Sequence, residues 1–178
     1  MQIRTAELAD LDVIKALDHS YMTDHVWQMS GNDNRNESSA TFRLAVLPRQ
    51  MQAQYPHDTV ALRRILHRCD YLWVMLADNG QDVLGYIGTS TLPWQNTAWV
   101  PCFCVAPTAR RKGIGTQLVR TAMQQAQTDN LHSLTLDLQT KNYPATRFFQ
   151  KLGFRFSGYS DNYYSARDIA LFFTYRIH

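Results

Sequence analysis

The order of hydrophobic and polar positions along the chain predicts a layered domain of strands and helices. Alternating or continuous apolar runs, typical of strands, occur at residues 3–5, 42–47, 71–77, 83–91, 98–105, 134–138, 154–157 and 169–176. Helical spacing of apolar residues predicts helices from Asp10, around 62–69, over 114–128 and from Pro144, the first with Leu11, Ile14, Leu17 and Tyr21 on one face. Helices that alternate with strands predict an α/β or layered α+β fold.

Breaks in this pattern predict turns and loops. The polar, aperiodic segment 31–40 (GNDNRNESSA) is expected to be a surface loop with freedom to move. Pro48 is expected to end the strand before it, and Pro101 to interrupt the strand 98–105. No linker or repeat divides the 178 residues, so we expect one domain over 1–178.

Composition narrows the class of protein. With 45% hydrophobic and 19% charged residues, the chain has a globular composition. The longest apolar run, residues 71–77, is too short for a membrane helix, and the acidic N-terminus lacks a signal-peptide core. Cys69, Cys102 and Cys104 form neither a disulfide framework nor a zinc spacing. We therefore expect a cytoplasmic protein with no bound metal and no membrane partner.

The net charge of +3 divides unevenly along the chain. Residues 1–99 contain 8 Lys/Arg and 11 Asp/Glu, whereas residues 100–178 contain 10 Lys/Arg and 4 Asp/Glu, which gives −3 and +6. An anionic ligand is therefore expected to bind the C-terminal half.

A basic, glycine-containing loop lies between the predicted strand that ends at Val105 and the helix near 114. The first turn of a helix exposes backbone N–H groups that bind anions, and Gly113 and Gly115 allow a phosphate to approach the backbone. The loop lacks the spacing of a P-loop and the third glycine of a dinucleotide fingerprint. From the loop alone, the alternative is a basic helix cap that binds nothing.

Two motifs together resemble the GNAT acetyltransferase superfamily. The first is Arg110-x-x-Gly113-x-Gly115, and the second is Asn142-x-x-Ala145-x-x-Phe148-Phe149-x-Lys151-Leu152-Gly153-Phe154. The tail, with Gly158-Tyr159 and Tyr163-Tyr164, is similar to the streptothricin acetyltransferase branch, as is Leu138-Gln139-Thr140.

The resemblance implies a twisted mixed sheet with a central splay, flanked by helices on both faces, and acetyl-CoA in the splay. It implies that the pantetheine arm pairs with the backbone of Phe103, Cys104 and Val105. The pyrophosphate would lie on Arg110, Arg111, Lys112, Gly113, Ile114, Gly115 and Thr116. Asn142 would bind the pantetheine, and Phe148, Phe149 and Lys151 would line the far wall.

The implied reaction is direct transfer of acetyl from the thioester to a primary amine. This sequence departs from the family pattern, because Phe149 stands where many members have a Tyr acid, and 101–104 lacks an acidic residue. Ordered water, or Asp137 on the next strand, would have to serve as the base. Tyr143, Tyr159, Tyr163 or Tyr164 could replace the acid, and Tyr164 is the candidate we retain. Cys104 is either a nucleophile or a buried apolar residue, and the latter is the commoner role of a strand cysteine.

The acceptor site is expected after the first helix. Asp24 could hold a cationic amine between Tyr21 and Trp27; the alternative is a surface turn with Trp27 in the core. The acceptor is a small molecule or a protein amine, no nucleic acid is expected, and a homodimer is left open. A CoA-binding sensor without catalysis is the alternative function.

Overall fold

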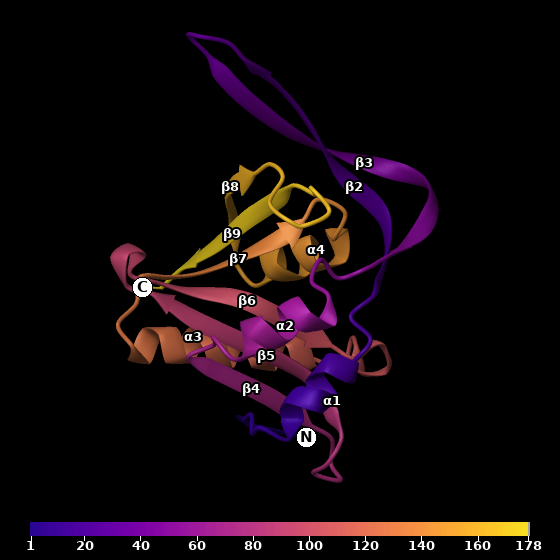
Figure 1. Cartoon of the computed structure of the whole chain (residues 1–178), viewed down its shortest axis with the longest axis vertical. Helices are drawn as coiled ribbons and strands as arrows, with labels where there is room; N and C mark the ends of the chain where they lie inside the picture. The colour runs from indigo at the N-terminus through magenta and orange to yellow at the C-terminus, as the bar shows by residue number, and fades with distance from the viewer. Residues whose placement is uncertain (178) are drawn as a thin grey trace.

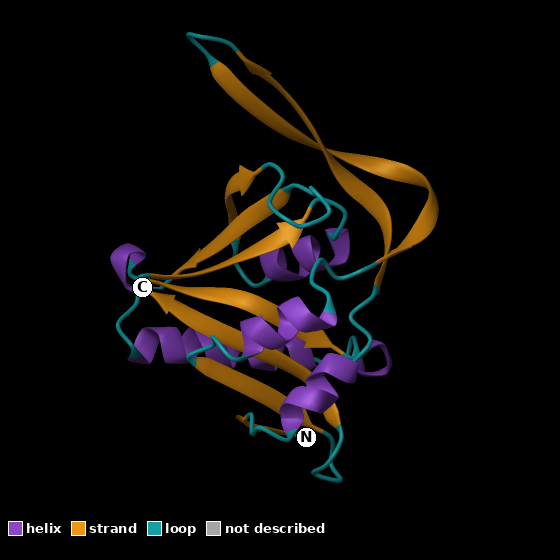
Figure 2. Cartoon of the chain, viewed as in Figure 1, coloured by secondary structure: helices purple, strands orange, loops and turns teal. Residues whose placement is uncertain are grey.

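A computed structural model describes residues 1–177 as a seven-stranded sheet, four α-helices and a separate two-stranded hairpin. The main sheet has the order β1-β4-β5-β6-β7-β9-β8 (Figures 1 and 2). The strands are β1 (Gln2–Thr5), β2 (Tyr21–Asp33), β3 (Ser38–Ala53), β4 (Tyr71–Leu76), β5 (Val83–Leu92), β6 (Thr97–Val105), β7 (Ser133–Gln139), β8 (Arg155–Ser160) and β9 (Ala170–Arg176). The helices are α1 (Asp10–Ala16), α2 (Thr59–Leu66), α3 (Ile114–Thr128) and α4 (Tyr143–Lys151).

Helices cover both faces of the sheet, as the resemblance implied. On one face, Ile14 of α1 and Leu62 and Leu66 of α2 pack against β4 and β5. On the other face, α3 buries its apolar stripe together with Phe149 of α4; the stripe residues are Ile114, Leu118, Val119, Ala122 and Ala126. Within residues 1–177, none of the helices is long and apolar enough to span a membrane.

The segment predicted as a surface loop is instead the tip of a long hairpin. Residues 31–33 and 38–40 are paired strand, and only 34–37 turn. The Asn34 side chain accepts hydrogen bonds from the backbone N–H groups of Asn36 and Glu37, which closes the turn. Both faces of this outer part are solvated, so it has no apolar alternation that the sequence could reveal. Figure 1 shows the hairpin rising away from the main sheet.

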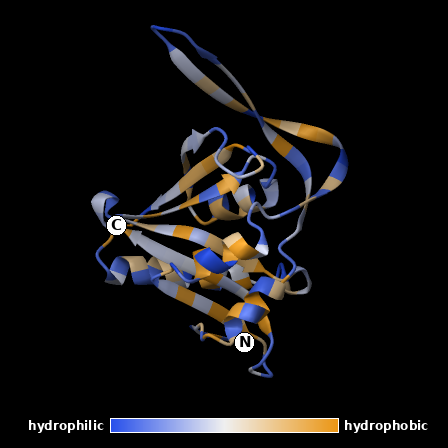
Figure 3. Cartoon of the chain, in the orientation of Figure 1, coloured by the Kyte–Doolittle hydropathy of each residue, from blue (hydrophilic) through white to orange (hydrophobic). Residues whose placement is uncertain are grey.

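Two further predictions near the hairpin were wrong. Tyr21 does not extend the first helix, because Leu17 is already extended (ψ 145°) and Tyr21 begins β2. Pro48 does not end its strand either. It lies in an irregular stretch, residues 47–50, that sits opposite Asp24 between the pairs Thr23↔Met51 and His25↔Val46. Figure 3 shows hydrophobic and hydrophilic bands in turn along this part of the hairpin. Val46, just before the irregular stretch, is 74% exposed.

Strand β6 contains a bulge at Pro101, where the sequence predicted an interruption. Val100 and Pro101 together oppose the single residue Thr89, between the pairs Ser90↔Trp99 and Gly88↔Cys102. A bulge reverses which face the following side chains occupy. Val100 accordingly packs in the α3 core, whereas Cys102 packs in the α1–α2 core.

Candidate active site

The main sheet opens between β6 and β7. These parallel strands pair only from Thr97↔Ser133 to Val100↔Leu136. Beyond that point, β6 continues beside β5 to Val105↔Gly85, and β7 continues beside β9 to Gln139↔Ala170. The edge of residues 101–105 that faces β7 therefore lacks a strand partner within the described chain. This is the predicted splay, and it contains Phe103, Cys104 and Val105.

The basic loop leads from β6 into α3 with two residues in the left-handed region. These are Arg111 at φ +65° and Gly113 at φ +82°. Gly113 is the N-cap of α3 and supplies no side-chain cap, so the first-turn N–H groups of Ile114, Gly115 and Thr116 face outward as potential anion donors. Arg111 and Lys112 are exposed beside them.

Arg110 has a different role from the one its charge suggested. Its Nε donates to the Val105 carbonyl at 2.9 Å, and another guanidinium nitrogen donates to the Ser20 carbonyl at 2.8 Å. The side chain thus joins the end of β6 to the residue before β2. The side-chain charge directed to the loop surface comes from Arg111 and Lys112.

Gly115 lies close against two aromatic rings. Phe103 and Phe148 stack with 5.7 Å between ring centroids and 6° between planes. A Cβ at position 115 would lie 3.1 Å from the Phe103 ring and 3.2 Å from the Phe148 ring. The absence of a side chain therefore lets the helix start lie directly on these rings.

The second motif forms the start and the buried side of α4. Asn142 is the N-cap and accepts a hydrogen bond from the Ala145 N–H at 3.3 Å, so its Oδ1 already has a structural role. Phe149 is 2% exposed and packs against Phe103, Phe148 and Phe154, which makes it a core side chain rather than an open wall of a groove. Lys151 is exposed at the end of α4.

Asp137 and Tyr164, predicted separately, meet where the sheet opens. Asp137 is the first residue of β7 beyond its pairing with β6, and the Tyr164 hydroxyl donates to its Oδ2 at 2.5 Å. Burial raises the pKa of Asp137 to about 6, although the hydrogen bond from Tyr164 opposes this effect. The pKa of Tyr164 is raised by burial and by the nearby carboxylate. Asp137 makes no ion pair with a basic residue in the described chain.

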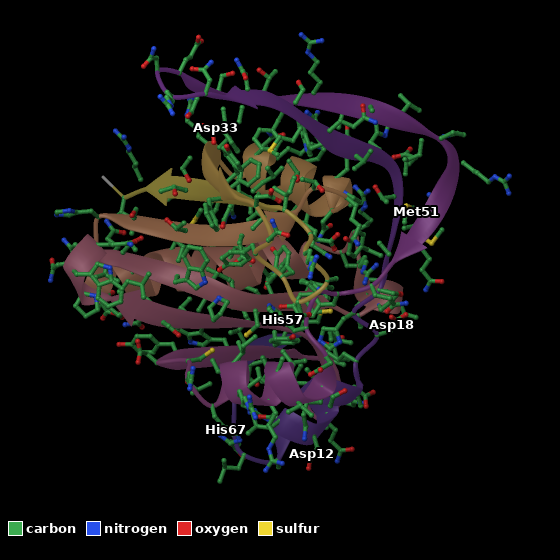
Figure 4. The ribbon with its side chains drawn as sticks, turned by 45° about the horizontal axis from the view of Figure 1, so that its top comes forward. Asp12, Asp18, Asp33, Met51, His57 and His67 are labelled. Atoms are coloured by element: carbon green, nitrogen blue, oxygen red, sulfur yellow. The ribbon has the colours of Figure 1, made fainter. Side chains whose placement is uncertain are left out.

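Aromatic side chains cluster around Tyr164, the partner of this carboxylate. His57 packs against Tyr164 (6.0 Å between centroids) and Tyr55 (5.3 Å), and Tyr163 packs against Tyr164 (5.1 Å). Figure 4 shows His57 near the middle of the molecule, beside the loop that precedes β9. Burial lowers the pKa of His57, which favours a neutral ring at pH 7.

The three predicted acceptor residues do not form one site. Tyr21 is buried, and its hydroxyl donates to Gln139 at 3.0 Å. Asp24 is exposed and bonds to the Nδ1 of His25 at 2.6 Å. Trp27 packs against the α3 core, with its Nε1 buried and without a partner in residues 1–177. The acidic side chain therefore lies apart from the aromatic rings that were expected to wall its ligand.

Cys104 is a buried apolar residue, the commoner of the two roles considered. Burial raises the pKa of its thiol to about 12, so the thiolate is scarce at neutral pH. All three cysteines are unpaired, and the described residues contain no cluster of three metal-ligating side chains.

Sequence reasoning missed Tyr55, His57, Gln139 and Asp168. The polar positions of β7, which are Ser133, Thr135, Asp137 and Gln139, alternate with buried leucines and could have indicated Gln139. The other three lie in connections without periodicity, where the sequence carries no comparable signal.

Comparison with known proteins identifies the family. The model of the acetyltransferase (GNAT) family matches residues 33–154. The chain belongs to the GNAT acetyltransferase family. Its co-substrate is therefore acetyl-CoA, as the two motifs implied.

Solved structures agree with this acetyltransferase fold. Nourseothricin acetyltransferase superposes with a TM-score of 0.84 at 23% identity, over 98% of this chain and 97% of that one. A Bacillus anthracis str. Ames protein named as a streptothricin acetyltransferase, in complex with acetyl coenzyme A, gives 0.75 at 20% identity, over 99% and 97%. Ribosomal-protein-S18-alanine N-acetyltransferase from Escherichia coli gives 0.65 at 14%, over 99% and 93%. Among curated protein sequences, none matches significantly.

Proposed function

We propose that this acetyltransferase moves the acetyl group of acetyl-CoA directly onto a primary amine held at Asp137. The observation that carries the proposal is a half-buried carboxylate, without a basic partner in the described chain, at the point where β6 and β7 separate. The natural counter-ion of such a group is the cation of the acceptor.

The cofactor would bind along the splay and the start of α3. Pantetheine amides would pair with the free edge of residues 101–105, as an added strand does. The pyrophosphate would bind the first-turn N–H groups from Gly113 to Thr116, with Arg111 and Lys112 adding charge. The amide nitrogen of Asn142 remains available to the pantetheine arm because only its oxygen caps α4.

The acetyl transfer would then proceed by proton transfer, attack on the thioester and departure of the CoA thiolate. Asp137 is ionised above about pH 6 and attracts the acceptor ammonium. Asp137 accepts one proton from this ammonium, which leaves a neutral amine with a free electron pair. The amine nitrogen then attacks the thioester carbon, and the new C–N bond makes its second proton acidic, so that this proton passes to water. The C–S bond breaks with its electron pair on sulfur. A thiol pKa of ~8.5 makes this thiolate a tolerable leaving group without a Tyr at position 149.

Tyr164 supports Asp137 in this proposal and does not supply the leaving-group proton. Its hydroxyl already donates to the carboxylate, and the pKa of the phenol is raised. The surrounding rings of Tyr55, His57 and Tyr163 would provide faces that suit an ammonium group.

The acceptor is proposed from the neighbours. Nourseothricin and other streptothricin-type amines are the first candidates, because two similar structures carry those names. Protein amines are the second class, since the Escherichia coli neighbour is named for an alanine of a ribosomal protein. A cytoplasmic location, no nucleic-acid partner and an open choice between monomer and homodimer complete the proposal.

A thiol-release assay with acetyl-CoA and a panel of these amines tests the proposal. Asp137→Asn should lower kcat/KM by ~10²–10⁴-fold while CoA affinity stays within twofold. Asp33→Asn, at the exposed hairpin tip, is the matched control and should retain activity. CoA binding without turnover of any amine would favour a CoA-binding sensor. That alternative is considered because Phe149 stands where many family members have a Tyr acid. Full activity in Asp137→Asn would reject Asp137 as the base.

A further inference from the structure

A chain of polar side chains links three distant segments next to Asp137. The Tyr21 hydroxyl donates to Gln139 Oε1 at 3.0 Å, and Gln139 Nε2 donates to Asp168 Oδ2 at 2.7 Å. Lys141 Nζ donates to the same Asp168 oxygen at 2.7 Å. Gln139 is 3% exposed and lies two residues after Asp137 on β7, on the same face.

Asp168 also holds the loop that carries Tyr164. Its carbonyl accepts from the backbone N–H groups of Tyr163 at 3.2 Å and Tyr164 at 3.4 Å. The Arg167 N–H donates back to the Tyr164 carbonyl at 2.8 Å. Asp168 is thus fixed to β7 through its side chain and to Tyr164 through its backbone.

These contacts converge on one hydrogen bond, from the Tyr164 hydroxyl to Asp137 Oδ2. We propose that Gln139 and Asp168 are positioning residues, which set the protonation of Asp137 by holding Tyr164 in donating position. The inference rests on the proposed role of Asp137 for its effect on catalysis. Its effect on the titration of Asp137 is independent of that role.

The groups around Asp137 decide how the inference should be tested. Tyr163 and Tyr164 face it from the loop before β9, and Tyr55 lies near it from the connection between β3 and α2, where His57 packs against Tyr164. Asp168 is a further negative charge on the same side of the sheet, partly neutralised by Lys141. Removing the Asp168 charge by itself should lower the pKa of Asp137, so a charge-matched pair of variants is needed.

Asp168→Ala and Asp168→Asn form that pair. Both remove the charge, but the Asn oxygen can still accept from Gln139. Asp168→Ala should release Tyr164, and loss of the Tyr164 hydrogen bond raises the pKa of Asp137. The midpoint of the Asp137 titration in Asp168→Ala should therefore exceed the midpoint in Asp168→Asn by about half a pH unit or more. The difference should vanish in a Tyr164→Phe background, because the donor through which it acts is then absent.

The primary measurement is the carboxyl infrared band of Asp137, identified by its loss in Asp137→Asn and followed with pH. The acid limb of kcat/KM for the best amine is the second. If Asp168→Ala does not fold, Gln139→Leu is used in place of the two Asp168 variants, because it leaves the charge unchanged. It should raise the midpoint of the Asp137 titration relative to wild type.

Equal midpoints for the two Asp168 variants, or a difference that persists with Phe at position 164, would overturn the inference. A purely structural role would lower the melting temperature and leave the midpoints of the two Asp168 variants equal to each other. If Asp137→Asn is fully active while the infrared shift is present, the base assignment fails and the positioning role stands. If Asp137→Asn is inactive and the shift is absent, the reverse holds.

Discussion

The proposed cofactor side and the proposed acceptor side of this acetyltransferase are built in different ways. The cofactor side uses neighbouring residues: a strand end, the loop 110–116 and the first turn of α3, with Phe148 packed beside Gly115. The proposed acceptor side links distant segments through side chains: Tyr164 bonds to Asp137 and packs against His57, while Gln139 bonds to Tyr21 and Asp168. Backbone groups thus dominate the first site and side chains the second, so the two should respond differently to mutation.

The largest expected effect is on the cofactor side. Gly115→Glu places a bulky anion between Phe103, Phe148 and the phosphate position, and should weaken CoA binding by more than ~100-fold. Calorimetric titration with CoA measures this. Gly80→Glu, in an open turn where an added Cβ would meet no atom within 4 Å, is the control and should bind normally. Unchanged affinity in Gly115→Glu would place the pyrophosphate elsewhere.

The acceptor side should show a conflict between stability and activity. The pKa of Asp137 is about 6 in the fold against 3.8 without it, so the folded state disfavours the ionised carboxylate. Asp137→Asn should therefore raise the free energy of unfolding by roughly 1–3 kcal/mol at pH 7.5. The gain should fade as the pH falls from about 6 to about 4, because wild-type Asp137 then becomes neutral in the fold.

Urea unfolding of both proteins at pH 4, 6 and 7.5 measures this difference. A constant difference at all three pH values would show that the titration of Asp137 is not responsible.

Phe149→Tyr separates a core role from a catalytic one. The ring is buried among three phenylalanines, so an added hydroxyl should lose water without gaining a partner. We expect the free energy of unfolding to fall by about 1–2 kcal/mol, without a gain in kcat. Thermal unfolding and the thiol-release rate decide the matter. A faster enzyme of unchanged stability would show that the hydroxyl reaches the reacting sulfur.

The smallest effect is expected at Asp24. Its carboxylate is exposed and bonds to His25 on the hairpin. Asp24→Lys should therefore change the acceptor KM by less than about twofold, as surface ion pairs contribute little. A KM raised tenfold or more would return Asp24 to the acceptor site.

The same contrast explains what the sequence could predict. The helix over 114–128 and the alternating strand of Leu134, Leu136 and Leu138 were confirmed, because periodicity specifies them. The splayed sheet, which the family resemblance implied, was also confirmed. Asp137 and Tyr164 could each be named as candidates, but their contact depends on how residues 27 positions apart fold together. The outer hairpin was missed because paired strands that face water on both sides lack an apolar period.

The bulge at Val100 and Pro101 has a consequence for how this protein tolerates changes in chain length. At this point β6 has one residue more than β5. Every second residue from Ala98 to Cys104 is therefore buried, but the residues before the bulge pack in the α3 core and those after it pack in the α1–α2 core. Deleting Pro101 would restore ordinary pairing, because Val100 would oppose Thr89 and Cys102 would still oppose Gly88. Phe103 and Cys104 would therefore keep their faces. A single-residue deletion at this bulge should be tolerated better than one in the regularly paired residues 102–105, where it would exchange the faces of the side chains that follow.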